Sequence, residues 1–317
     1  MSRRAALLSI PAAILICGAP FVGPELSDDV GQFVFWNLRV PRVLVAALVG
    51  ATLSTVGAVY QTLFANPLAT PGTVGTTAGA TMAALVAMVF GAGTHVLGLP
   101  IVMAAAFVGA LGVSAVVTFI AVRGDVGTNE IVLAGVACSV AASAIALGVQ
   151  FSADSEALLA AARWSLGNLQ QIGYVGASWL AVVTVTSSVP LLRVGRSLDA
   201  MAGGLEVAHA QGVSVRRVRS LCVAFGSLGV GACVASCGPI AFVELIVPNL
   251  LRALGCVRPT LLLPLSALVG AAFLVTCDTA ARTLLSGREI PVGVVTAALG
   301  APAMVALLWR RRGNRGE

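Results

Sequence analysis

The stretch GPIAFVELIVPNLLR, residues 238–252, combines features that seldom occur together in one apolar segment. It is shorter than the roughly 20 residues that a helix needs to cross a bilayer. It contains Pro239 and Pro248, and it carries a carboxylate, Glu244, near its centre. A charge at the middle of a membrane-spanning helix costs about 3 kcal/mol on insertion scales. We therefore expect the Glu244 carboxylate to be protonated, to pair with a cation, or to line a wet cavity.

The rest of the chain is predominantly apolar. Of its 317 residues, 58% are hydrophobic and 10% are charged, and the mean hydropathy is +0.98. A soluble domain carries about 25% charged residues. Successive apolar runs of about 18 to 25 residues are typical of membrane-spanning helices. The sequence therefore predicts an all-α polytopic membrane protein, in which the 35 glycines let helices approach closely.

The charged and reactive residues argue against several classes of protein. All 19 basic residues are arginines, scattered through short loops, which does not favour a nucleic-acid partner. The seven cysteines fall almost entirely within apolar runs, no CxxC pair is present, and His95 and His209 are isolated, so we expect no metal site and no cofactor. No nucleophile–base pair indicates a catalytic residue, which makes an enzyme the least favoured class.

Ten apolar runs can be placed along the chain. The first resembles a signal peptide, but it lacks a small-residue cleavage site, so we expect an uncleaved span. The predicted spans lie near residues 5–23, 43–65, 72–92, 97–121, 131–150, 174–192, 217–237, 239–256, 260–284 and 291–309.

The arginine distribution supports this count and sets the orientation. An even number of spans puts both termini on one side, and cytoplasmic loops carry most of the arginine. Five arginines fall on the far side, namely Arg39, Arg42, Arg163, Arg282 and Arg288, and the other fourteen fall on the side of the termini. We therefore predict cytoplasmic termini.

Two loops are longer than the others. Residues 151–173 form an external loop with a short amphipathic helix around Ala157 to Leu166. Residues 193–216 form a cytoplasmic loop in which Leu198, Met201, Leu205 and Ala208 recur at helical spacing, with Gly203–Gly204 as a break between two short helices. The periodicity favours a docking surface and an interfacial helix on the bilayer equally.

Four ordered stretches resemble one family of transporters. They are RVPRVLVAALVGATLSTVGAVYQTLFANPLATPGTVGTTAGA (39–80), LEVAHAQGV (205–213), GPIAFVELIVPNLLR (238–252) and CDTAARTLLSGREIPVGVVTAALGAP (277–302). Together they resemble the FecCD-type permeases for iron–siderophore, haem and cobalamin import, the membrane subunits of type II ABC importers. The resemblance runs from about residue 31 to the C-terminus.

The resemblance implies one transmembrane permease domain over residues 1–317, with ten helices and two inverted repeats, 39–150 and 217–309. It also implies a dimer, with a second copy or a sister permease, around a central pathway. Breaks in matching positions of two such repeats line substrate routes, and Asn66–Pro67 and Pro248–Asn249 are the candidates here. Relatives usually have glycine in place of Glu244 and histidine in place of Asn249.

The resemblance also implies a separate ATPase. The chain contains no GxxxxGK[ST] phosphate loop, so nucleotide binding of that kind belongs to another subunit. Glu206, Ala208 and Gly212 match the family's coupling pattern, with Gly212 expected to turn the chain between the two short helices. His209 stands where many relatives have arginine, which puts a contact of this position with the ATPase in doubt.

On the outer face, arginines of relatives receive carboxylates from an extracytoplasmic substrate-binding protein. The matching positions are Arg39 and Arg42, which flank Pro41 at the expected mouth of the second span, and Arg282. Guanidinium–carboxylate pairs orient and steer such a partner. For an arbitrary outer-face arginine, anchoring in lipid headgroups is the commoner role.

Three acidic residues leave alternatives open. Glu244 could tune the pathway for a cationic or metal-bearing cargo, could pair with Arg252, or could mark a signature that has drifted in one of two unlike permeases. Asp278 has Arg282 at i+4 and predicts an ion pair that competes with docking or orients the arginine for it. Glu289, before Pro291, is expected to cap the last helix.

The sequence thus predicts an inner-membrane permease of an ATP-driven importer for a ferric siderophore or a related chelate. The alternative is an ion-coupled secondary transporter, which would need neither a docking loop nor the three arginines. A structural membrane protein without cargo is disfavoured by the glycine-rich, proline-broken spans. The residues do not identify the chelate.

Overall fold

The structure of the chain is a computed structural model that describes residues 3–23, 29–90, 95–96, 99–123, 128–169, 173–285 and 289–313. Arg288 and Arg315, which contribute to the arginine count above, lie outside these residues. The described residues are almost entirely helical, which confirms the predicted all-α class.

The elements of the first half, in chain order, are α1 (Arg3–Gly18), η1 (Ala19–Phe21), α2 (Asp29–Val34), the π-helical turn η2 (Phe35–Arg39), α3 (Val40–Leu63), η3 (Pro71–Val74), α4 (Thr76–Phe90), β1 (His95–Val96), β2 (Leu99–Pro100), α5 (Ile101–Arg123), α6 (Thr128–Gln150) and α7 (Ser155–Ser165). The two short strands pair antiparallel, with His95 opposite Pro100 and Val96 opposite Leu99.

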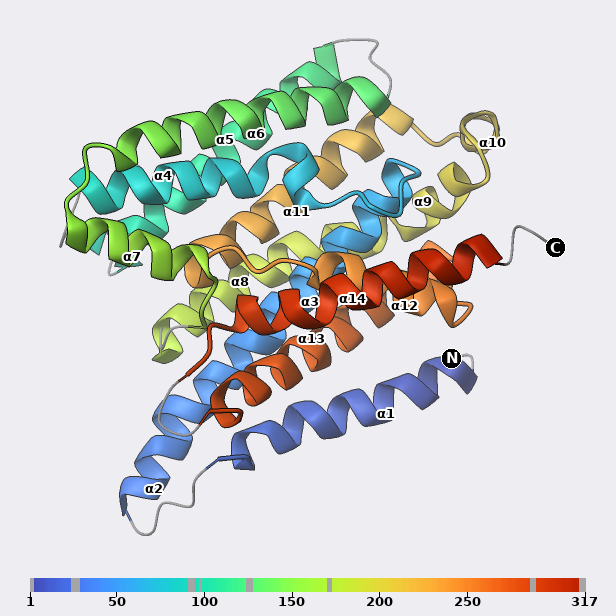
Figure 1. Cartoon of the computed structure of the whole chain (residues 1–317). Coiled ribbons are helices and arrows are strands. Elements are labelled where there is room, and N and C mark those ends of the chain that lie inside the picture. The colour runs from blue at the N-terminus through green and yellow to red at the C-terminus, as the bar shows by residue number, and fades with distance from the viewer. Residues whose placement is uncertain are drawn as a thin grey trace.

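The second half contains α8 (Gly173–Arg193), α9 (Gly195–Ala202), α10 (Leu205–Ala210), α11 (Val215–Cys237), α12 (Val243–Ala253), α13 (Pro259–Thr283) and α14 (Val292–Gly313). Figure 1 shows these helices stacked at shallow angles to one another, with α1 at the periphery beside α13.

The helices coincide in position with the ten predicted runs. Among the described residues, six helices are long and apolar enough to cross a membrane, namely Gly31–Leu63, Ile101–Ile120, Glu130–Gln150, Gly173–Arg193, Val215–Cys237 and Pro259–Thr283. Three shorter apolar helices cover Leu8–Phe21, Thr76–Phe90 and Val292–Leu307, and α12 has 11 residues. The count of ten crossings and the division into two repeats remain predictions.

The predicted start of the second span, at residue 43, is wrong. The chain is helical without interruption from Asp29 to Leu63. Pro41 lacks an N–H and would break a regular α-helical ladder, but it follows the π-turn η2, which absorbs the mismatch in hydrogen bonding. Arg39 and Arg42 therefore lie within a long helix and not at the mouth of one that begins after them.

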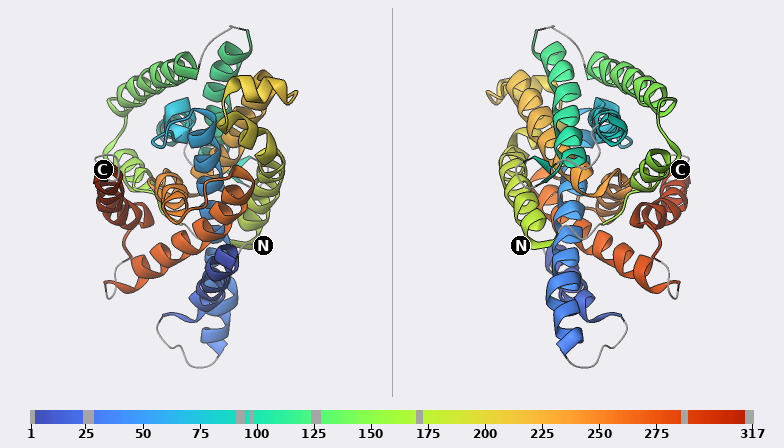
Figure 2. Two further views of the ribbon diagram at one scale, coloured as in Figure 1. Left: turned by 90° about the vertical axis from the view of Figure 1, so that its right-hand side faces the viewer. Right: turned by 90° about the vertical axis from the view of Figure 1, so that its left-hand side faces the viewer.

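The helix α3 is the axis of the bundle, as the two views of Figure 2 show. It contacts α13 most extensively, and also α8, α11 and α12. A methyl group added to Gly50 would lie 2.2 Å from the carbonyl oxygen of Gly270 in α13, and one added to Gly57 would lie 2.1 Å from the carbonyl oxygen of Glu244 in α12. Both approaches therefore require glycine, as expected where helices associate by close backbone packing.

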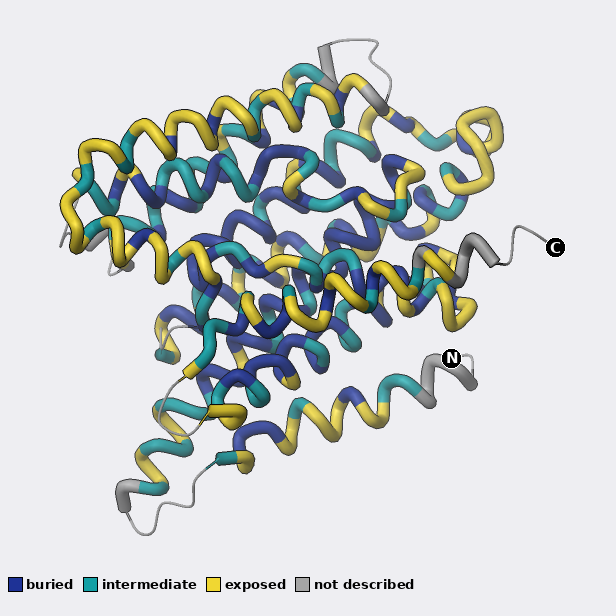
Figure 3. The backbone as a smooth tube through the Cα atoms, viewed as in Figure 1, coloured by how far each residue is buried: buried dark blue, intermediate teal, exposed yellow. Residues whose placement is uncertain are grey.

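Burial follows from this arrangement. The middle of the bundle is dark blue in Figure 3, whereas the outward faces of α5, α6 and α14 are exposed. These outward faces are apolar, with Val108, Val140 and Val305 exposed by 67%, 65% and 57%. Exposed apolar side chains at this density are typical of a surface that faces lipid.

The segment 238–252 begins with a break between helices, at residues 238–242, and continues as helix α12. After α11 ends at Cys237, Gly238 has a φ of +69° and Phe242 a left-handed φ of +72°, and α12 begins only at Val243. Pro239 prevents α11 from continuing regularly. The N–H of Asn168 donates to the carbonyl of Cys237 at 2.8 Å, so protein backbone satisfies a group freed by the break.

The loop that contains α7 packs directly against this break. The helix α7 confirms the predicted amphipathic segment, and Asp154 caps it by accepting a hydrogen bond from the N–H of Ala157 at 2.8 Å. Beyond α7, a methyl group on Gly167, Gly238 or Gly293 would lie 2.3, 2.3 or 2.2 Å from the carbonyl oxygens of Pro239, Trp164 and Leu166, respectively. We call this contact the three-glycine junction, because it holds the α7 loop, the α12 break and the start of α14 together.

Candidate functional site

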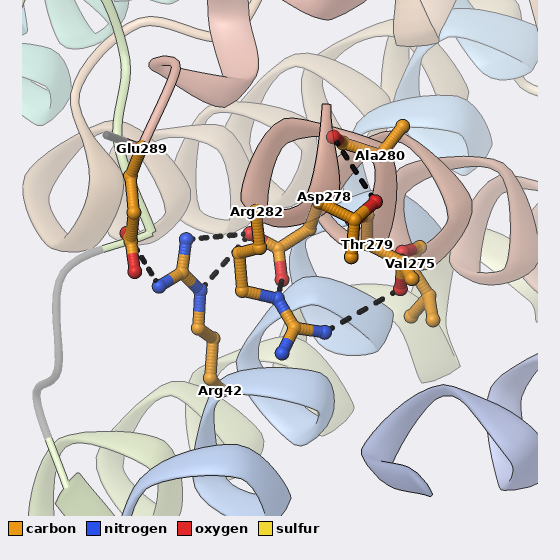
Figure 4. Close-up of polar contacts among 8 residues, drawn as sticks. Arg42, Val275, Asp278, Thr279, Ala280, Arg282 and Glu289 are labelled. Atoms are coloured by element: carbon orange, nitrogen blue, oxygen red, sulfur yellow. Dashed lines mark hydrogen bonds and ion pairs between the residues drawn. The ribbon is translucent and has the colours of Figure 1, made fainter. Parts of the chain in front are cut away.

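Four charged side chains gather where α3, the end of α13 and the approach to α14 meet (Figure 4). Arg42 donates from Nε to Asp278 Oδ1 at 3.0 Å and from Nη1 to Glu289 Oε2 at 2.8 Å. Its Nη2 lies 2.9 Å from the same Asp278 oxygen, and Arg282 Nε lies 3.2 Å from Asp278 Oδ2. We call these four residues the outer ion-pair cluster.

The outer ion-pair cluster is balanced in charge and mostly buried. The side chains of Arg42, Asp278 and Arg282 are exposed by 6%, 1% and 12%, whereas that of Glu289 is exposed by 56%. Asp278 accepts a hydrogen bond from Arg42 and forms an ion pair with Arg282, so each buried charge has an opposite charge nearby. Removing one partner from a buried pair leaves an uncompensated charge and costs about 3–5 kcal/mol.

A cavity of about 270 Å³ lies beside this cluster. Arg39, Arg42, Arg282 and Glu289 line it, together with Val22, Gly23, Val34, Leu38 and Thr283. The structure therefore brings the three predicted arginines to one place although residues 39 and 282 are far apart in sequence. Three guanidinium groups against one carboxylate make the lining positive, which suits an anionic group from outside.

Two sequence predictions need correction here. Arg42 was grouped with Arg39 and Arg282 as a docking residue, but it is buried and bonded to Asp278 and Glu289, because it supplies the counter-charge for both carboxylates. Glu289 was expected to cap the last helix, but its carboxylate binds Arg42. The predicted pair between Asp278 and Arg282 is confirmed. Arg39 and Arg282 are half-buried and border the cavity.

The predicted break at Pro248–Asn249 is wrong, because α12 continues from Val243 to Ala253 with Pro248 inside it. The interruption lies instead at residues 238–242. Asn249 nevertheless lies next to the other predicted break, at Asn66–Pro67. Asn249, on α12, is buried and donates from Nδ2 to the carbonyl of Pro67 at 2.9 Å. On the other break, Asn66 Oδ1 accepts from the N–H of Leu68 at 2.9 Å, a local turn that follows the left-handed Ala65. Asn249 therefore joins α12 to the break at Asn66–Pro67, and its place in the pathway stays a prediction.

A polar clasp joins α12 to the end of α3. Gln61 Nε2 donates to the carbonyl of Glu244 at 2.9 Å. Arg252 donates to Gln61 Oε1 and, at 3.3 Å, to Thr62 Oγ1. Sequence analysis missed Gln61, although a glutamine inside the apolar run of residues 43–65 was a detectable signal. These hydrogen bonds hold α12 against the end of α3 that lies away from the outer ion-pair cluster.

Glu244 does not form the predicted ion pair with Arg252, whose guanidinium is turned toward Gln61 and Thr62. Among the residues that the structure describes, Glu244 Oε2 is buried and has no hydrogen-bond partner. The residue lies in the first turn of α12, where the helix dipole favours a negative charge. Of the alternatives for Glu244, pairing with Arg252 is therefore wrong.

The loop of residues 193–216 folds as the two predicted short helices, α9 and α10, with the break at Gly203–Gly204. Leu198 is fully buried, and Asp199 Oδ1 accepts from the backbone N–H of Thr260 at 3.3 Å, so α9 is fixed to the start of α13. Glu206 and His209 are exposed, beside the exposed apolar side chains of Leu205 and Val207.

Two details of this loop differ from the prediction. Gly212 has the expected left-handed backbone, with a φ of +73°, but it turns the chain between α10 and α11, because Gly204, with a φ of +116°, already makes the turn between the short helices. Ala208 is fully buried and packs with Ala200 and Val215, so it supports α10 from within and does not face a partner.

No group of three or more His, Cys, Asp or Glu side chains that could hold a metal ion occurs within the described part of the chain.

Comparisons with known proteins agree on one family. Residues 9–310 match the family model described as "FecCD transport family". The vitamin B12 import system permease protein BtuC of Vibrio cholerae is 36% identical, covering 96% of this chain and 91% of its own length. The hemin transport system permease protein HmuU of Yersinia pestis is 34% identical over 91% of this chain and 87% of its own. A solved structure, "An inward-facing conformation of a putative metal-chelate type ABC transporter", is similar with a TM-score of 0.89 and 28% identity, covering 98% of this chain and all of that one.

The outer ion-pair cluster gives the first prediction. Asp278→Asn leaves Arg42 and Arg282 without their shared carboxylate, so we expect it to lower the free energy of unfolding by about 3 kcal/mol. Glu289→Gln removes a carboxylate that is more than half exposed, so its cost should stay below about 1 kcal/mol. Thermal or denaturant unfolding in detergent measures both, and equal losses from the two variants would contradict a central role for Asp278.

Proposed function

The chain belongs to the FecCD transport family, and from this premise we propose that it carries a ferric siderophore, or a related chelate such as haem or cobalamin, into the cytoplasm as the permease subunit of an ABC importer. The matching relatives are permease subunits of transport systems, and two of them are named for vitamin B12 and hemin. Such a subunit is a transport component and not an enzyme. We further propose that it lies in the inner membrane with both termini in the cytoplasm.

The observation that carries this proposal is the presence of two surfaces suited to partners, joined by one helix. The arginine-lined cavity lies near the end of α13, and α9 is fixed to the start of α13 through Asp199 and Thr260. Asp278 follows Thr260 by 18 residues, a rise of about 27 Å at 1.5 Å per residue, which is close to the hydrocarbon thickness of a bilayer. A partner on each face of the membrane can thus act on the two ends of α13.

On the cytoplasmic face, we assign the partner as a separate ATPase that docks on α9 and α10. Glu206 and His209 offer polar contacts and Leu205 and Val207 an apolar ridge. Ala208 and Gly212 hold this surface in shape, the first through packing and the second through its turn into α11. A second permease, as another copy or a sister subunit, completes the pathway in this proposal.

Dependence on ATP distinguishes this proposal from an ion-coupled secondary transporter. In vesicles that contain the permease, its ATPase and its binding protein, we expect accumulation of the chelate only when ATP is present on the ATPase side. Ionophores that collapse ion gradients should leave the initial rate unchanged. Accumulation by the permease alone, driven by a proton or sodium gradient, would overturn the proposal.

On the outer face, we assign Arg39 and Arg282 as the residues that receive carboxylates of a substrate-binding protein, with Arg42 as the residue that holds Asp278 and Glu289 in place. Arg39→Glu is expected to abolish uptake that depends on the binding protein, because it places like charges opposite each other at the contact. Arg282→Glu should do the same, but it also disturbs the pair with Asp278. Uptake assays with saturating and limiting binding protein measure the effect.

The matched control for this reversal is Arg163→Glu. Arg163 is an exposed arginine of the external helix α7 and does not line the cavity. It makes the same change of charge on the same face, so uptake should be retained. Size-exclusion chromatography and retention of the ATPase subunit verify folding of each variant, and undiminished uptake with both Arg39 and Arg282 reversed would exclude the docking role.

We also propose that α12 lines the pathway and that Glu244 tunes it for a cationic or metal-bearing cargo, because its buried carboxylate has an oxygen with no hydrogen-bond partner among the described residues. Losing one such charge interaction of about 1.4 kcal/mol slows uptake about tenfold, which we expect for Glu244→Gln and for Glu244→Gly. The glutamine variant keeps the size and tests the charge alone. Uptake rates equal to wild type in both variants would assign Glu244 a purely structural role.

A further inference from the structure

A second cavity, of about 540 Å³, opens between α5 and α11 and shares no lining residue with the arginine-lined cavity. Its walls include Ala115, Thr118 and Phe119 of α5 and Ala224 of α11, and Ser114 and Ser227 form its floor. Ala115, Phe119 and Ala224 are exposed, so the cavity is an open groove and not an enclosed chamber. Its volume is within the range of sites that hold small molecules. We call it the α5–α11 groove.

The floor of the groove has no free polar group to offer a ligand. Thr76 Oγ1 lies 2.9 Å from Ser114 Oγ and 3.1 Å from Ser227 Oγ, and both serines are buried. These hydroxyl groups therefore satisfy one another inside the protein. What the groove presents outward is apolar, which fits a hydrocarbon chain better than a polar solute.

The groove has a cationic rim at one end. Arg216 and Arg217, in the first turn of α11, are exposed. They precede Ala224 by eight and seven residues, a spacing that places them on the same face of the helix as Ser220 and Ala224. At 1.5 Å per residue, the guanidinium-bearing turn begins about 12 Å from the groove.

The helices α5 and α11 run antiparallel, because Gly231 of α11 lies against Ala110 of α5, whereas Ser227 and Ser114 meet at Thr76. The groove therefore extends toward the arginine-rich end of α11. Ser114 and Ser227 lie at one depth because both contact Thr76, and Phe119 follows Ser114 by five residues in the direction in which α11 leads back to Arg216. The arginine-rich side is the cytoplasmic one by the positive-inside rule. One leaflet contributes about 15 Å of hydrocarbon, half of the roughly 30 Å core, so an acyl chain in the groove puts its phosphate at the level of the arginines.

We propose that the α5–α11 groove binds an anionic phospholipid of the cytoplasmic leaflet, with one acyl chain in the groove and the phosphate at Arg216 and Arg217. Basic clusters next to clefts between membrane helices select anionic headgroups by charge, and guanidinium groups bind phosphate oxygens in a forked geometry. The proposal does not depend on the cargo or on the partners assigned above.

Lipid retention tests the proposal directly. The full-length permease is reconstituted into nanodiscs of equal parts phosphatidylglycerol and phosphatidylcholine, transferred to mild detergent, and the lipids that remain bound are counted by native mass spectrometry. We expect wild type to retain phosphatidylglycerol preferentially, with about fivefold enrichment for each arginine. Arg216→Gln/Arg217→Gln should remove this preference, and Ala224→Phe, which fills the groove, should reduce bound lipid of both kinds.

The matched control is Arg193→Gln/Arg196→Gln, which removes the same charge from two exposed arginines near α9 and should preserve the preference. Three outcomes would overturn the proposal. One is equal retention of the two lipids by wild type, and another is a preference that survives in Arg216→Gln/Arg217→Gln. The third is a change in oligomeric state with Ala224→Phe while lipid binding stays the same, which would identify the groove as an interface between copies of the chain.

Discussion

The close approach of α3 to its neighbours is the constraint on which the rest of the structure depends. Gly50 and Gly57 allow the backbones of α13 and α12 to lie against α3 at distances that no side chain tolerates. Lipid provides no hydrophobic force that would bring helices together, so van der Waals packing at such positions supplies much of the association. The axis formed in this way positions the candidate sites, since α3 carries Arg42 near one end, directly after Arg39 of η2, and Gln61 near the other.

Buried charged side chains in the bundle generally share their counter-charges with one another. Asp278 forms ion pairs with two arginines, and Arg42 forms ion pairs with two carboxylates. This sharing lowers the free-energy cost of burying ionised groups in a weakly polar environment. Glu244 departs from this pattern, because among the described residues its buried carboxylate forms no ion pair, and one of its oxygens has no hydrogen-bond partner. A departure of this kind in a membrane helix usually marks a functional position, and it is the basis for assigning Glu244 to the pathway.

Local patterns in the sequence predicted local structure well. Hydropathy located the apolar helices, the spacing of Asp278 and Arg282 predicted their ion pair, and Gly203–Gly204 predicted the break between α9 and α10. The errors arose where contacts between residues far apart in sequence determine the local structure. The partner of Asp278 at Arg42 is 236 residues away, and no spacing rule reveals it. Pro41 suggested a helix start, but the π-turn before it lets the helix continue. Gly212 was assigned to the turn between α9 and α10, which Gly204 makes, because both glycines can adopt a positive φ.

The three-glycine junction has a mechanical consequence. At Gly167, Gly238 and Gly293, carbonyl oxygens occupy the space where side chains would otherwise lie, and the N–H of Gly293 donates to Gly167 O at 3.1 Å. Interiors packed to this density transmit displacement instead of absorbing it. The junction therefore couples three segments, and we expect a displacement of the α7 loop to move the break before α12, next to Glu244, and the start of α14 together.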